Sequence, residues 1–201
     1  MSQILKDNVR NKIIDSALVE FSKKGFIETS MLNVANTAGV SVGNIYRYFK
    51  NKEELFYTII RNDFAKNLKK RVIERINFAN IIGFNNVKNN TDFQRLDVDF
   101  VKFCFENKYK LIILFDKAKG TTFENFKEEL ILDIKNHLVS TIIINKEFEG
   151  SQDIFTIIYA NLIQGMIEIV KKEENLQNIS KQIDSIIKYH LFGFLIFFNK
   201  S

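Results

Sequence analysis

Two tyrosines, an arginine and two lysines lie close together in the stretch AGVSVGNIYRYFKNKEEL, residues 38–55. Their hydroxyl, guanidinium and ammonium groups are donors that suit phosphate oxygens or base edges. The residues just before them, Ser41 to Asn44, carry almost no bulk. A core helix would begin with apolar side chains, and Gly43 costs a helix about 1 kcal/mol relative to Ala. The pattern therefore indicates a helix end that presses against another molecule.

Short helices with capping residues between them must position this stretch. Apolar residues at helical spacing predict a first helix over residues 8–24, which Gly25 ends. Thr29 and Ser30 offer hydroxyl caps for a second helix, MLNVANTA. Asn51 and Glu54 form a plausible capping box for a long fourth helix that begins at Lys52.

The segment between the second and third helices has the spacing of a helix-turn-helix. Gly39 lies at the turn, where a positive φ is needed, and Ser41 caps the third helix. Small or apolar residues fall where two crossed helices would meet: Val34, Ala35, Val40 and Ile45. The second helix of such a motif, which is the third helix of this chain, enters the DNA major groove with its N-terminal residues nearest the bases. That role explains the slim residues Ser41, Val42, Gly43 and Asn44, which begin a recognition helix expected over residues 41–48.

Several polar residues around the motif are candidate DNA contacts. Three of them follow at the height of the groove wall: Tyr46, Arg47 and Tyr48. Lys52 begins the next helix, where free N–H groups and the helix dipole favour a phosphate, and Thr29 and Ser30 repeat that arrangement at the second helix. Residues 1–52 also hold eight Lys/Arg and four Asp/Glu, so they carry +4 of the net charge of +5. A basic segment attached to a nearly neutral body favours a polyanionic partner.

Residues 8–56 resemble the DNA-binding domain of the TetR family of bacterial transcriptional regulators. The family pattern A-G-V-S-x-G-x-[LI]-Y-x-[HY]-F-x-x-K-x-x-L is filled without gaps by Ala38, Gly39, Val40, Ser41, Gly43, Ile45, Tyr46, Tyr48, Phe49, Lys52 and Leu55. Asn33 stands where the family often has an acid, and Tyr48 where His is common. The resemblance implies phosphate contacts by Thr29, Ser41, Tyr46 and Lys52, and base contacts near Val42, Gly43, Asn44 and Arg47. It leaves Val34, Ile45, Phe49 and Leu55 as the small core.

The composition predicts an all-α protein. Proline is absent and glycine numbers 8, which favours long helices over a β-sandwich or barrel. We expect a helix-turn-helix DNA-binding domain over residues 1–52 and a larger helical domain over 53–201, with about nine helices in all. Further helices are expected near residues 93–106, 109–117, 123–144, 154–172 and 179–198. The resemblance implies that the second domain binds a small molecule and forms the homodimer through its last two helices.

Apolar stripes on the last two expected helices are consistent with such a dimer. They contain Ile158, Leu162, Gly165 and Ile169 on one helix, and Ile183, Ile187, Leu191 and Phe194 on the other. Two copies of each would pair as a four-helix bundle, and Gly165 would allow close approach. The alternative is that both stripes complete the core of one subunit.

The aromatic residues of the body are candidates for an effector pocket. An apolar or aromatic ligand would contact some of Phe100, Phe103, Tyr109, Phe115, Phe123, Phe126 and Tyr159. Ordinary core packing is the alternative for most of them. His137 and His190 are isolated, no Cys/His cluster suggests a metal, and the single Cys104 reads as a buried thiol. No cofactor is expected.

Three other functions stay open at the level of sequence. No phosphate loop, nucleophile elbow or H-E-x-x-H motif supports an enzyme. The C-terminal LFGFLIFF could serve a membrane surface, although burial in a dimer explains it equally, and the apolar runs are too short to span a bilayer. A DNA-binding architectural protein without an effector would carry the same motif. With no visible signal peptide, we expect a cytoplasmic protein, and repression is the family's usual mode.

Overall fold

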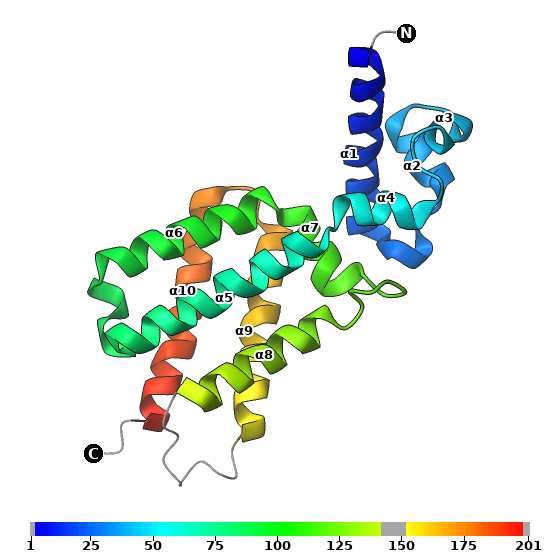
Figure 1. Cartoon of the computed structure of the whole chain (residues 1–201). Helices are drawn as coiled ribbons and strands as arrows, with labels where there is room; N and C mark the ends of the chain where they lie inside the picture. Colours follow the sequence, from blue (N-terminus) through cyan, green and yellow to red (C-terminus); the bar gives the residue numbers. More distant parts are fainter. Residues whose placement is uncertain (1–2, 142–151, 199–201) are drawn as a thin grey trace. The chain divides into compact units, whose positions relative to one another are not determined.

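The computed structural model describes residues 3–141 and 152–198, which contain helices and no β-strand (Figure 1). The chain forms two compact units. The first contains Met1–Lys66 together with Tyr109–Lys127, and the second contains Asn67–Lys108 and Glu128–Ser201. The all-α prediction is confirmed. The sequence predicts a different kind of boundary, after residue 52, between the DNA-binding part and the rest of the chain. That boundary stays a prediction.

Four helices build most of the first unit: α1 (Gln3–Glu28), α2 (Met31–Ala38), α3 (Val42–Tyr46) and α4 (Lys52–Ile59). The α1 helix contains a break at Gly25, whose φ of 85° lies in the left-handed region that favours glycine. The α2 helix has the bounds read from the sequence. It ends at Gly39, which has φ 61° and ψ 39° and donates its N–H to the carbonyls of Ala35 and Asn36.

The core of the first unit is apolar and aromatic. Most residues predicted to form the small core are buried, namely Val34, Ala35, Ile45, Phe49 and Leu55, whereas Val40 is half-buried. Phe21, Phe26 and Phe56 form an aromatic cluster beside them, with ring centroids 5.1 to 6.1 Å apart. Edge-to-face packing of this kind adds to the burial of the rings themselves.

A segment distant in sequence completes the first unit. It includes the end of α7 (Lys108–Ile112) and the π-helical turn η2 (Ile113–Lys117), which packs against α1. A Cβ on Gly25 would lie 3.3 Å from the carbonyl oxygen of Lys117, so this contact also depends on the glycine. The backbone N–H of Thr122 donates to the Tyr57 hydroxyl at 3.1 Å.

The prediction of one long fourth helix that begins at Lys52 is wrong. The chain forms α4 and then a separate α5 (Asn62–Ile82), with the break at Ile60 and Arg61. Ile60 has φ −102° and ψ 88°, and its side chain is fully buried. The break therefore follows from packing, because neither residue is a glycine or a proline.

The second unit contains most of α5 together with η1 (Phe84–Asn89), α6 (Thr91–Glu106), most of α8 (Phe126–Thr141), α9 (Gln152–Lys172) and α10 (Leu176–Phe198). The α10 helix packs against α9 and α6. Lys69 of α5 bridges Glu129 and Asp133 of α8 at 3.1 and 3.0 Å. Residues 142–144, expected to end α8, lie outside the described residues.

Cys104 is buried on α6, as the sequence predicts. Burial raises the pKa of its thiol to about 12, although the nearby Arg75 and Arg71 charges act in the opposite direction. The thiol is therefore protonated and unreactive at neutral pH. In the described part of the chain, no helix is long and apolar enough to cross a membrane, and no cluster of residues could hold a metal ion.

Candidate nucleic-acid interface

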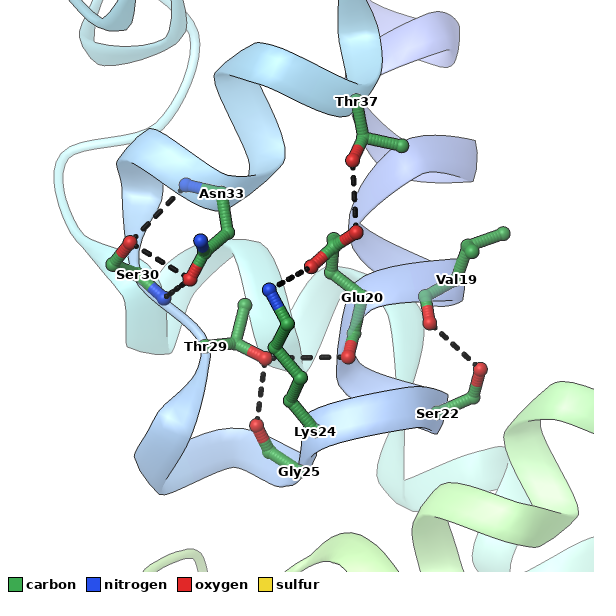
Figure 2. A network of polar contacts seen from close by, with 9 residues as sticks. All are labelled: Val19, Glu20, Ser22, Lys24, Gly25, Thr29, Ser30, Asn33 and Thr37. Carbon is green, nitrogen blue, oxygen red and sulfur yellow. Dashed lines mark hydrogen bonds and ion pairs between the residues drawn. The ribbon is translucent and has the colours of Figure 1, made fainter.

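The start of α2 is fixed by a reciprocal cap (Figure 2). The Ser30 hydroxyl accepts from the backbone N–H of Asn33 at 3.1 Å, and the Asn33 amide oxygen accepts from the backbone N–H of Ser30 at 3.0 Å. In a capping box the acceptor at this position is commonly a carboxylate oxygen. Here it is the neutral amide oxygen of Asn33. The helix end is therefore capped without adding negative charge, and Ser30 stays exposed beside it.

Thr29 is placed differently from the expectation. Its side chain is 1% exposed, and its hydroxyl donates to the carbonyl oxygen of Gly25 at 2.7 Å, with Glu20 O at 3.3 Å (Figure 2). A hydroxyl turned inward in this way cannot reach a phosphate. Thr29 instead holds the chain together at the Gly25 break through these hydrogen bonds. Its position does not support the phosphate contact that the sequence suggested.

Glu20 joins α1 to α2 from inside the unit. One carboxylate oxygen accepts from the Thr37 hydroxyl at 2.8 Å, and the other pairs with Lys24 at 3.0 Å (Figure 2). Burial alone would raise the pKa of Glu20. The hydrogen bonds from Lys24 and Thr37, together with the positive charges of Lys24 and Lys23, lower it by more, so the pKa of Glu20 lies below its usual value. No local sequence pattern predicts this contact, because it joins residues seventeen positions apart.

The α3 helix begins where the sequence predicts. Ser41 is the N-cap, and its hydroxyl accepts from the backbone N–H of Asn44 at 3.2 Å. The helix is shorter than the expected 41–48 and reaches only Tyr46, with Arg47 as the C-cap. Ile45 is buried and anchors the helix, while Ser41, Gly43, Tyr46 and Arg47 are exposed. Val42, Asn44 and Tyr48 are half-buried.

Gly43 has no structural requirement within the described chain. Its φ lies outside the left-handed region, and a Cβ built on it would meet no atom within 4 Å. Glycine is therefore unfavourable here for the free protein, since Ala would fit and would favour the helix. The side chains of its exposed neighbours Tyr46 and Arg47 make no hydrogen bond or ion pair with any residue that the structure describes.

Lys52 is bound within the unit. Its ammonium group donates to the carbonyls of Phe26 and Ile27 at 2.7 and 3.2 Å and lies 4.4 Å from the centre of the Phe26 ring. Asn51 caps α4 as predicted and accepts from the N–H of Glu54 at 2.8 Å, but the Glu54 carboxylate accepts from Lys50, one residue before the reciprocal position. Two of the three N–H donors of this ammonium group are therefore used within the unit, and the third remains for a phosphate.

Comparison with known proteins identifies the motif. Residues 13–59 match the family described as bacterial regulatory proteins, tetR family. The N-terminal domain belongs to the tetR family. The tetR-family domain is 37% identical over 65 residues to the transcriptional regulator YfiR of Bacillus subtilis, a match that covers 32% of each chain. It is 46% identical over 50 residues to AcrR of Shigella flexneri, covering 25% of this chain and 23% of AcrR.

These matches span about a third or less of the curated relatives' length. Similarity beyond the tetR-family domain is visible in the fold. A TetR-like transcriptional regulator from Rhodococcus sp. RHA1 is 22% identical, with a TM-score of 0.52 over 96% of this chain and 99% of that one. A transcriptional regulator from Aquifex aeolicus VF5 gives a TM-score of 0.50 over 90% and 98%, at 22% identity.

The structure divides the aromatic residues expected around an effector between the two units. The first unit contains Tyr109, Phe115, Phe123 and Phe126, and the second contains Phe100, Phe103 and Tyr159. Phe115 packs edge-on against Phe126, whose side chain is buried. Burial raises the pKa of Tyr159 above its ordinary value. Of the seven, only Phe100 lines the cavity described for the second unit, which is mostly polar.

The expected dimer residues fall into four groups. Ile183 is fully buried in its own subunit, so it cannot face a partner and is corrected to core. A Cβ on Gly165 would lie 2.1 Å from Ile186 Cδ1, so Gly165 faces α10 of the same chain. The others with described side chains are half-buried: Ile158, Leu162, Ile169 and Ile187. The side chains of Leu191 and Phe194 lie outside the described residues.

Proposed function

We propose that the chain is a DNA-binding transcriptional regulator that acts as a homodimer on a near-palindromic operator. The observation that carries the proposal is the exposed face of α3. It combines an unconstrained Gly43 with the unpaired donors of Tyr46 and Arg47, inside a tetR-family domain. Such a face suits the major groove, where a helix end approaches base edges and the donors reach bases or phosphates.

The proposed roles of individual residues follow from their exposure. Arg47, Val42, Gly43 and Asn44 lie where bases would be read, while Ser30, Ser41 and Tyr46 would contact phosphates. Arg10 lies over the Phe49 ring at 5.3 Å and is exposed, so it is a further candidate for the DNA backbone. Thr29 positions the start of α2 through its internal hydrogen bonds.

Repression with release by an effector is the mode that we propose. Similar proteins include the repressor KstR of Rhodococcus jostii, which is 37% identical over 57 residues. An effector in the second unit would favour a subunit arrangement that does not fit the operator, which requires it to bind the released state more tightly. We place the protein in the cytoplasm, where its operator would be, and assign it no catalytic role and no cofactor.

The homodimer is proposed on the exposed apolar residues of α9 and α10. Ile154, Ile157 and Tyr189 are 38, 54 and 75% exposed, and the half-buried Ile158, Leu162, Ile169 and Ile187 lie on the same two helices. Pairing of these helices with their copies would form a four-helix bundle.

DNA titrations with the full chain test the proposal. Affinity for a short mixed-sequence duplex is measured at several salt concentrations for the wild type, for Tyr46→Phe and for the control Tyr109→Phe. Tyr109 is 42% exposed in the same unit and outside the helix-turn-helix. We expect the wild type to lose affinity steeply with salt, because phosphate contacts release counterions. Tyr46→Phe should bind several-fold more weakly, whereas equal binding by all three proteins would contradict the role of Tyr46.

A further inference from the structure

A polar cavity lies between α5 and α6 in the second unit. Its volume is about 190 Å³. The residues that matter for the argument are Lys70, Arg71, Glu74 and Arg75 from α5, and Leu96 and Phe100 from α6. The cavity is smaller than the 300 to 1,000 Å³ of sites for drug-sized ligands, so its occupant must be small or inserted end-on.

Arg71 lacks an anionic partner in this cavity. Its guanidinium lies over the Phe103 ring, 4.6 Å from the centroid, and makes no ion pair with any residue that the structure describes. Its Nε is buried without an acceptor. A buried donor without an acceptor is unfavourable, and more so when the group is charged. Arg71 is therefore a cationic side chain whose hydrogen-bonding capacity is not fully used in the free protein.

Arg75 holds the neighbouring position one helical turn away. It pairs with Asp97 of α6 and lies over the Phe100 ring at 4.3 Å, yet its Nε is also buried without an acceptor. Residues four apart share one face of a helix, so both guanidinium groups face the same side of α5. Lys70 is paired with Glu74 at 3.6 Å. One cationic side chain of the cavity, Arg71, thus stays unneutralised.

We propose that this cavity binds a small organic carboxylate that carries a short apolar group. One unneutralised guanidinium matches a monoanion, and its planar fork matches the two oxygens of a carboxylate. Leu96 and Phe100 provide an apolar wall for the remainder of the molecule. The assignment of this ligand as the effector rests on the proposed function, and it adds a carboxylate to the small apolar or aromatic effector that the sequence suggests.

The residues of this cavity show a regular spacing in the sequence. Arg71 and Arg75 are spaced i, i+4, and the aromatic residues that they cover, Phe100 and Phe103, are spaced i, i+3. Two basic residues opposite two aromatic residues at helical spacing form an arrangement in which each guanidinium group lies over one ring. Only the tertiary pairing of the two helices reveals it.

Calorimetric titration of the full chain, without DNA, tests the site. The probes are benzoate, its neutral analogue benzamide and inorganic phosphate, at matched ionic strength. Benzoate should bind at least tenfold more tightly than benzamide, because only the anion neutralises Arg71. Arg71→Gln should weaken benzoate binding at least tenfold. The matched control is Arg95→Gln, which alters an exposed arginine of α6 paired with Asp92 outside the cavity, and it should bind as the wild type does.

Each contrary result overturns a defined part of the inference. Absence of benzoate binding at millimolar concentration, or equal binding of benzoate and benzamide, would reject an anion site. Unchanged binding by Arg71→Gln would reject this cavity as its location, and tighter binding of phosphate would reject the apolar group. Because no DNA is present, these outcomes are independent of operator binding. Release of DNA by benzoate, measured afterwards, tests the effector role separately.

Discussion

Polar side chains of the tetR-family domain divide into those that bind within the domain and those that face solvent. Thr29, Glu20 and Lys52 are engaged by backbone carbonyls or by neighbouring side chains. Tyr46 and Arg47 on α3 are exposed and have no side-chain partner in the described residues. The sequence pattern indicated Thr29 and Lys52 as candidates together with Tyr46 and Arg47, but it could not separate them, because burial depends on how the helices pack.

Substitution of Gly43 by Ala should separate stability from DNA binding. The change should raise the free energy of unfolding by up to about 1 kcal/mol, because the position is helical and nothing lies within 4 Å of the new Cβ. DNA affinity should fall, because the methyl group stands where the helix approaches the duplex. Urea unfolding and DNA titration measure the two effects. Gly39→Ala is the control for a glycine that the fold needs, and it should destabilise the protein because its φ is 61°.

Replacement of Lys52 by Ala should reduce stability as well as DNA binding. Loss of the two carbonyl contacts and of the contact with Phe26 should lower the free energy of unfolding by about 1 to 2 kcal/mol. The control is Lys50→Ala, because Lys50 is exposed and only its backbone N–H makes a hydrogen bond. Unchanged stability together with a smaller salt slope would instead show that Lys52 serves DNA alone.

Local signals predicted the helices of the domain better than the connections between them. Caps at Ser30, Ser41 and Asn51 are visible in the sequence because they depend on residues three positions apart. The break between α4 and α5 carries no such signal. Attachment of η2 to the domain is equally invisible, because it depends on packing against Gly25 across more than eighty residues.

Gly165 lies where α9 packs against Ile186 of α10. Gly165→Ala should destabilise the chain by about 1 kcal/mol or less, because the atom that the new methyl group overlaps is the end of the Ile186 side chain, which can turn, and because Ala favours the helix. The double variant Gly165→Ala/Ile186→Val removes the overlapping atom and should recover most of the loss. Thermal unfolding measures both. An equal loss in the single and double variants would contradict the proposed contact.

The proposed function requires that two copies of the chain form a symmetric dimer. A near-palindromic operator requires two recognition helices related by a twofold axis, so the chain should sediment as a dimer at micromolar concentration. Ile157→Asp on the exposed side of α9 should produce monomers, because a charge would be buried between the helices. Leu132→Asp is the control, as Leu132 is equally exposed on α8. A wild-type chain that sediments as a monomer, or dimers in both variants, would contradict the proposed surface.

Selection of genomic DNA fragments on the purified full chain, at about 150 mM salt, tests the central claim most directly. At this salt concentration weak non-specific binding is largely removed. The account predicts that the retained fragments share a near-palindrome with two half-sites, and that Arg47→Ala retains fragments with a changed base preference. Retention of unrelated sequences only, or of none, would contradict sequence-specific regulation by this chain.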